Sequence, residues 1–200
     1  LQEQIRPLDI VIPDQFIDRT HHRPATFFNE GVVAHVMMSD PFCSNLSSLL
    51  CDVGEDHIPG GRQLHRAGTY LAMEGPAFST RAESNLYRQW GCSIIGMTNH
   101  TEARLAREAE IAYASLSMVT DYDCWNQSQD EVNVEMIIEN LRINTLVANK
   151  IVYETAKRID DERPNSKAHQ ALRDGLMTSK ENASKQAESK VKIFTDSYWL

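Results

Sequence analysis

Apolar residues gather in three short, uncharged runs in the middle of the chain, at Thr69–Met73, 93–97 and 112–119. Segments with helical spacing of apolar residues separate them. This alternation predicts buried strands of one mostly parallel sheet that is flanked by helices, which is an α/β fold. Another apolar run, at residues 10–12, stops at Pro13 and is expected to form a further strand.

Capping signals mark where the intervening helices begin. Thr80 and Glu83 form a capping box, and Gly91 follows the helix as a stop signal. The apolar face expected for this helix is Ala82, Leu86 and Trp90. Asn99 and Glu102 give a similar start to the next helix. Its expected sheet-facing residues are Leu105, Ala106 and Ala109.

A third capping box, Ser128 and Glu131, predicts a long helix that runs to about Arg158. One face of this helix should carry Ile137, Leu141, Ala148 and Val152. Upstream, residues 44–66 start as a weak helix that breaks at the Pro59-Gly60-Gly61 turn signal.

Polar residues follow two of the predicted strands, where ligands of parallel sheets gather. Thr98 precedes a helix N-terminus, where free amides and the helix dipole favour an anion such as phosphate, although Thr98 could merely end a strand. Asp121 and Asp123 could accept hydrogen bonds from a donor-rich heterocycle, bind a metal, or act as a general acid and a general base. A solvated turn is the alternative, and a metal is the weakest interpretation because no ligand set accompanies the pair.

Composition narrows the class of protein. Two hundred residues with 42% apolar content fit one domain with a sizeable core. The net charge of −8, without a basic cluster, argues against nucleic-acid binding. We expect no membrane contact, because no apolar run approaches the roughly 20 residues of a span, and a cytoplasmic location, because no signal peptide opens the chain. The cysteines are expected to be reduced thiols: Cys43, Cys51, Cys92 and Cys124.

Two histidine-containing segments are ambiguous from sequence. Residues 19–24 form a basic loop with adjacent His21 and His22, which could hold an anion but is more simply a solvated loop. His35 lies beside apolar residues, and a lone histidine in that setting is usually just packed.

Four segments together resemble a known family. They are EGPAFSTRAES, the strand that ends in Gly96-Met97-Thr98, TDYDCW, and DIVIPDQFIDRT near the start, with DPFC at residues 40–43 as a further match. The chain is similar to the methylthioadenosine phosphorylases of the purine nucleoside phosphorylase superfamily, from Leu1 to about Tyr153.

The resemblance implies a pentosyltransferase that works without a cofactor. Phosphate, the co-substrate, would attack the ribose of 5′-methylthioadenosine to give adenine and 5-methylthioribose 1-phosphate. As the glycosidic bond breaks, negative charge accumulates on the purine, and a carboxyl group that donates a proton would relieve it. The resemblance gives this role to Asp121.

The resemblance also implies a set of substrate contacts. Asp123 would accept a hydrogen bond from the exocyclic amine, and Ser79 stands where relatives that prefer 6-oxopurines carry Glu. Thr98 would bind phosphate, and Met97 would lie under the ribose. The remaining implied substrate contacts are Phe78, Ile95, Val134, Ile137, Ile138, and His35 reaching across a subunit interface.

The resemblance further implies a homotrimer and a chain that is incomplete. The family's glycine-rich opening and its Arg-His phosphate pair have no counterpart, so we expect truncation at the N-terminus. We expect a partial phosphorylase domain at residues 1–158 and a divergent polar tail at 159–200. Two alternatives remain open: a purine nucleoside phosphorylase of broader base range, or an inactive purine-binding fragment.

Overall fold

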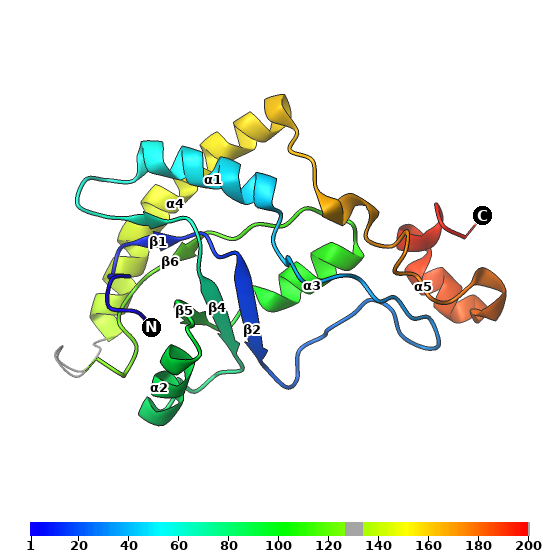
Figure 1. Ribbon diagram of the computed structural model, residues 1–200, viewed down its shortest axis with the longest axis horizontal. Coiled ribbons are helices and arrows are strands. Elements are labelled where there is room, and N and C mark those ends of the chain that lie inside the picture. The colour runs from blue at the N-terminus through cyan, green and yellow to red at the C-terminus, as the bar shows by residue number, and fades with distance from the viewer. Residues whose placement is uncertain (127–133, 200) are drawn as a thin grey trace.

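The computed structural model describes residues 1–126 and 134–199, and it is an α/β fold with two small sheets (Figure 1). Strands β2 (Gln15–Arg19), β4 (Thr69–Met73) and β5 (Ile94–Gly96) form a parallel sheet in that order. In the second sheet, β1 (Ile10–Val11) pairs in parallel with β3 (Leu64–His65) and antiparallel with β6 (Ser117–Met118). The predicted α/β class, with mostly parallel strands flanked by helices, is therefore confirmed, but the described strands form two small sheets instead of the one sheet that was predicted.

The main core lies between the second sheet and two helices, α1 (Ser44–His57) and α4 (Val134–Glu162), which lie side by side (Figure 1). Ile10 and Ile12 of the predicted strand are fully buried there against Leu49, Val53 and Ile151. The buried residues of both helices pack against the apolar side chains of this strand and form one cluster with them. The predicted break after the first helix is confirmed, since α1 ends one residue before Ile58 and a turn follows at Gly60 and Gly61.

The first two predicted strands are confirmed, but the third is mostly not a strand. Of residues 112–119, only Ser117 and Met118 pair, and they pair antiparallel with β1 instead of joining the parallel sheet. The rest of this segment is half-buried because it runs along the wall of a cavity rather than beside a neighbouring strand. Strand β2 was not predicted, since its QFIDR sequence mixes charged and apolar residues at the edge of the sheet.

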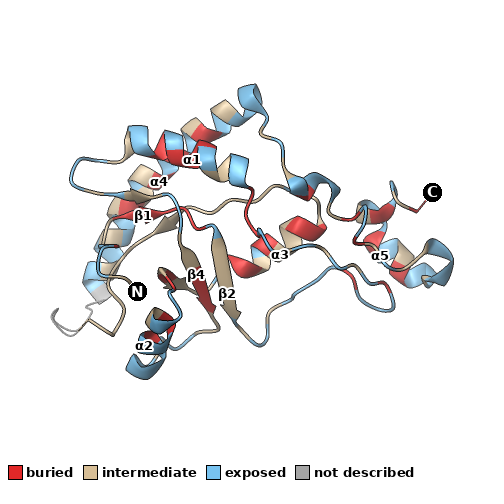
Figure 2. Cartoon of the chain, in the orientation of Figure 1, coloured by how far each residue is buried: buried red, intermediate tan, exposed pale blue. Residues whose placement is uncertain are grey.

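Helix α2 (Arg81–Gln89) begins at the predicted capping box, in which Thr80 and Glu83 cap each other. Its predicted apolar face is wrong. Leu86 and Trp90 are exposed, and so is Ala82, whereas Ser84 and Tyr87 are buried (Figure 2). The helix packs through Tyr87 into a cluster with Leu1, Leu71 and Cys92, so tertiary contacts and not apolar spacing set its orientation.

Helix α3 (His100–Glu108) starts where expected, but its first turn differs from the prediction. The Asn99 side chain does not cap the helix and instead donates to Ser115 Oγ over 3.3 Å. The buried side of α3 consists of His100, Ala103, Arg107 and Glu108, while the predicted Leu105, Ala106 and Ala109 are only half-buried.

Helix α4 runs four residues beyond the predicted end. Of its predicted face, only Ala148 is buried, while Leu141 and Val152 are exposed and Ile137 is half-buried. The buried side is offset from it, through Asn144, Ala148, Ile151 and Thr155. The predicted Ser128 and Glu131 capping box lies outside the described residues.

The end of the chain packs into a separate cluster, called here the peripheral core. It joins Phe28 and Val32 to Leu172 and to helix α5 (Lys185–Thr195), and Trp199 completes it. Short 3-10 turns, η1 (Lys167–Gln170) and η2 (Lys180–Asn182), lead to this helix. The peripheral core lies at one end of the long axis, away from both sheets (Figure 1).

Candidate active site

A cavity of about 520 Å³ opens where the carboxyl ends of β4 and β5 meet the segment around β6. The predicted residues that line it come from three separate stretches of sequence. They are Phe78, Ser79, Ile95, Met97, Thr98, Asp121 and Asp123. Asp121 and Asp123 therefore line the same cavity as the residues that follow β4 and β5. This agrees with the expectation that ligands of parallel sheets gather at the carboxyl ends of the strands.

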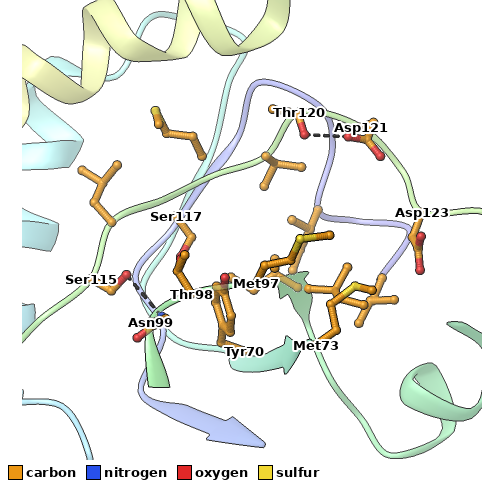
Figure 3. Close-up of a pocket in the computed structure, with 18 of the residues that line it drawn as sticks. Tyr70, Met73, Met97, Thr98, Asn99, Ser115, Ser117, Thr120, Asp121 and Asp123 are labelled. Carbon is orange, nitrogen blue, oxygen red and sulfur yellow. Dashed lines mark hydrogen bonds between the residues drawn. The ribbon is translucent and has the colours of Figure 1, made fainter. Parts of the chain in front are cut away.

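Polar groups occupy two ends of this cavity, with methionine side chains between them (Figure 3). Asp121 and Asp123 lie at one end. Thr98, Asn99 and Tyr70 lie at the other. The arrangement suits a ligand that is polar at both ends, since the apolar middle offers contact area without hydrogen bonds.

The surroundings of Asp121 raise the pKa of its carboxyl group. Burial raises the pKa of its carboxyl, and the nearby Asp123 charge raises it further, while a hydrogen bond from Thr120 opposes them. Thr120 Oγ1 donates to Asp121 Oδ2 over 2.6 Å. A carboxyl with a raised pKa in a cavity is a candidate proton donor. Asp123 also lines the cavity, and its Oδ2 is a buried acceptor without a hydrogen-bond partner in the described part of the chain.

The backbone of the acidic loop is fixed from helix α4. Asn140 Nδ2 donates to Thr120 O over 2.7 Å, and Asn144 Nδ2 donates to Val119 O over 2.9 Å. Arg81 and Cys124 tie the same loop to the segment after β4, because Cys124 Sγ donates to Ser79 O over 3.4 Å and Arg81 Nε to Cys124 O over 3.3 Å. The acidic residues are thus held on a rigid frame, as a precise site requires.

Phe78 is 77% exposed at the cavity, so its ring is available to a ligand rather than packed in the core. Ser79 Oγ is 3.5 Å from Met73 Sδ. Phe78 and Ser79 lie in the segment between β4 and α2, and they line the cavity together with Met97, the residue after β5.

Sequence reasoning missed the tyrosines of this cavity. Tyr70 enters from β4 beneath Gly96, and a Cβ on Gly96 would lie 1.9 Å from the Tyr70 hydroxyl. The glycine therefore makes room for the ring. Burial raises the pKa of Tyr70, and raises that of Tyr113 to about 12, so both phenols remain protonated and can donate. A glycine inside a strand is the signal that could have revealed the close approach.

Other predicted contact residues lie elsewhere in this chain. His35 is exposed in the peripheral region, where its amide donates to Gly175 O over 2.7 Å. Ile137 is half-buried and Ile138 exposed on α4, and neither is among the described residues that line the cavity. The side chain of Val134 lies outside the described part.

The basic loop at residues 19–24 is not simply solvated. The backbone amides of His21 and His22 donate to the Glu74 carboxylate, and Arg23 Nη2 donates to Glu74 O over 2.9 Å. The hydrogen bonds that the His21 and His22 amides donate to the carboxylate lower the pKa of Glu74. An internal carboxylate therefore takes the place of an external anion at this loop.

Comparison with known proteins shows which family the chain belongs to. Residues 1–157 match the family model described as the phosphorylase superfamily. The chain is 65% identical over 199 residues to an S-methyl-5′-thioadenosine phosphorylase of Prochlorococcus marinus, covering 100% of this chain and 63% of the relative. It is 52% identical to the protein of that name from Thermosynechococcus vestitus, over 99% of this chain and 68% of the relative.

Solved structures give the same result. A methylthioadenosine phosphorylase from an Antarctic soil metagenomic library superposes with a TM-score of 0.91 at 45% identity, covering 96% of this chain and 67% of that one. The Schistosoma mansoni methylthioadenosine phosphorylase in complex with adenine gives 0.75 at 28% identity, over 98% and 68%. The chain spans about two thirds of the length of these relatives. On this similarity and this architecture, the chain belongs to the S-methyl-5′-thioadenosine phosphorylase family of the phosphorylase superfamily.

Proposed function

We propose that the protein phosphorolyses 5′-methylthioadenosine to adenine and 5-methylthioribose 1-phosphate. The observation that carries this proposal is that one cavity is lined at one end by Asp121, whose carboxyl has a raised pKa, and at the other end by Thr98, just before the N-terminus of α3. The purine of a nucleoside would bind at the carboxyl end, and phosphate would bind at the Thr98 end. The names of the relatives support the same substrate.

In the proposed reaction, a phosphate oxygen forms a bond to C1′ as the bond from C1′ to N9 breaks. The bonding electrons leave with the purine, and Asp121 donates its proton to N7. The raised pKa of Asp121 favours this role because the carboxyl keeps its proton to higher pH than an exposed aspartate. Thr98 and the free amides of the first turn of α3 would bind phosphate.

The base would sit between the acidic pair and Phe78. Asp123 would accept from the 6-amino group through its unpartnered oxygen, and the exposed Phe78 ring would stack on the base or the sugar. Ser79 would leave the 6-amino group room, and Met97 with Ile95 would contact the ribose side. The Schistosoma relative, solved with adenine, supports a 6-aminopurine ligand.

Other features of the protein stay predictions. These are the homotrimer, the cytoplasmic location, cofactor independence and the contact of His35 with a neighbouring subunit's substrate. Among the described helices, none is long and apolar enough to cross a membrane.

The deciding experiment measures adenine release from 5′-methylthioadenosine with and without phosphate, with adenosine and inosine as comparison substrates. Strictly phosphate-dependent release, with little cleavage of inosine, supports the proposal. Comparable cleavage of inosine would instead indicate a purine nucleoside phosphorylase of broader base range. Binding of the nucleoside without cleavage would leave a purine-binding protein and refute the enzymatic proposal.

A further inference from the structure

The first residue of helix α3, His100, is buried although it carries an ionisable ring. Only 2% of it is exposed, and it stands two positions after Thr98. Its Nε2 lies 3.1 Å from Thr20 Oγ1 and 3.1 Å from Thr101 Oγ1. Phe16 packs on the ring edge, with centroids 6.2 Å apart. The side chain therefore joins the start of α3 to the end of strand β2.

The partner of His100 on the β2 side is itself fixed. Thr20 donates to Asp18 Oδ1 through its amide over 2.8 Å and its hydroxyl over 2.7 Å. Arg104 Nη1 holds the other carboxylate oxygen at 3.1 Å, and His100 Nε2 is 3.5 Å from Asp18 Oδ1. Asp18 thus holds Thr20 and Arg104 together, which makes the end of β2 a firm support. The other ring nitrogen of His100, Nδ1, is buried without a hydrogen-bond partner among the described residues.

The backbone between Thr98 and His100 needs such a support. Asn99 has φ 78° and ψ −62°, and the His100 amide donates to Thr98 O over 3.0 Å. This is a γ-turn with positive φ at its central residue, a rare and strained conformation. A strained turn persists only where surrounding contacts fix it. The Asn99 side chain, bonded to Ser115, and His100 are the two residues that anchor it.

The turn determines where the phosphate-binding groups point. It sets the angle between Thr98, which follows β5 by two residues, and the amides at the start of α3. Thr98 and Asn99 both line the cavity, whereas His100 does not and lies behind them. An error in this angle would move the hydroxyl and the amides relative to each other, while the acidic end of the cavity would be unaffected.

We propose that His100 is a positioning residue for phosphate, because it anchors the strained turn after Thr98 to Thr20 and Asp18 at the end of strand β2. The inference rests on the proposed function. It assigns no contact between His100 and the substrate. Its specific consequence is that loss of His100 weakens phosphate binding more than nucleoside binding.

The test compares His100→Leu with the wild type in the full-length protein, with KM measured separately for phosphate and for 5′-methylthioadenosine. We expect the phosphate KM to rise about tenfold while the nucleoside KM changes by less than about twofold. His100→Gln, which keeps a nitrogen donor near Thr20, should restore most of the phosphate affinity. Thr20→Val should shift the phosphate KM in the same direction as His100→Leu.

His65→Leu is the matched control. His65 Nε2 lies 3.1 Å from Asp9 Oδ2, which makes another histidine–aspartate pair at a strand, but His65 does not line the cavity. This variant should lower the melting temperature without raising the phosphate KM. It separates general destabilisation from loss of positioning.

Two results would overturn the inference while the proposed function stands. One is an active wild type whose His100→Leu variant keeps its phosphate KM. The other is a parallel rise of both KM values that His100→Gln does not reverse. A wild type without phosphate-dependent turnover would refute the proposed function itself. Phosphate titration by calorimetry would then test the inference, which fails if His100→Leu binds phosphate as the wild type does.

Discussion

Among single residues, the two aspartates of the cavity are chemically similar but have different surroundings. Asp121 is hydrogen-bonded by Thr120 and carries a raised pKa, whereas one Asp123 oxygen is buried without a partner. One is suited to give a proton and the other to accept a hydrogen bond. In the proposed reaction, the two carboxylates therefore have different tasks because their surroundings differ.

Asp121→Asn should reduce kcat/KM for 5′-methylthioadenosine by about 100-fold or more, since loss of a general acid typically costs that much. The amide can still donate a hydrogen bond but cannot transfer a proton. The assay is initial-rate adenine release at saturating phosphate. Asp52→Asn, an exposed change on α1, should leave the rate unchanged, and equal rates for wild type and Asp121→Asn would refute the assignment.

The wild-type rate should also depend on pH in a defined direction. Burial raises the pKa of Asp121, so the catalytically competent protonated form persists above the pH at which an exposed aspartate ionises. Activity should therefore fall as pH rises through this raised pKa. A pH profile of kcat/KM checks this, and the alkaline limb should be absent from Asp121→Asn.

Asp123→Asn should alter base preference rather than abolish turnover. The amide can donate as well as accept, so the exclusive match to a 6-amino group is lost, at a cost of roughly 1–3 kcal/mol for an unsatisfied buried group. The ratio of kcat/KM for adenosine over inosine should fall by about tenfold. An unchanged ratio would show that Asp123 does not distinguish the 6-amino group of a purine from a 6-oxo group.

At the scale of elements, apolar spacing located the helices but not their orientation. Helix α2 turns Tyr87 inwards and leaves Leu86 and Trp90 exposed. In α4 the buried side includes Asn144, a polar residue that spacing rules assign to the surface. Asn144 is inside because its amide is needed by the Val119 carbonyl, so a long-range hydrogen bond outweighed apolar periodicity.

The contact of the peripheral core with residues 34–35 depends on Gly175. A Cβ there would lie 2.7 Å from Ala171 O and 3.1 Å from His35 O, and backbone atoms cannot move aside easily. We expect Gly175→Ala to lower the free energy of unfolding by about 1–3 kcal/mol, as overpacking does. Urea denaturation measures this. Gly60→Ala is the control, since a Cβ there meets nothing within 4 Å.

In the whole molecule, hydrogen bonds at the end of α3 attach the peripheral core to the part of the chain that contains the two sheets. Glu110 Oε1 accepts from Leu172 N over 2.9 Å and from Tyr198 Oη over 2.7 Å. Glu108 Oε2 accepts from Phe27 N over 2.6 Å. Two carboxylates of one helix end therefore connect segments that lie far apart in sequence.

Glu110→Ala should loosen this attachment without altering the cavity, because Glu110 does not line it. Hydrogen exchange should quicken at the Leu172 amide and along α5, while amides of β4 and β5 keep their protection. Glu181→Ala, an exposed change on η2, provides the comparison. Equal protection of α5 in wild type and Glu110→Ala would contradict this role.

The fold class, the positions of β4 and β5, and the cap of α2 could be predicted from the amino-acid sequence, because they depend on local polarity and on capping within a few residues. The resemblance also named seven of the residues that line the cavity. Only the tertiary structure decided which helix faces are buried, that residues 112–119 form a cavity wall, and that Tyr70, His100 and Asn144 support the site. These outcomes depend on contacts between residues distant in sequence, such as His100 with Thr20 or Asn144 with Val119, and local patterns carry no information about such pairs.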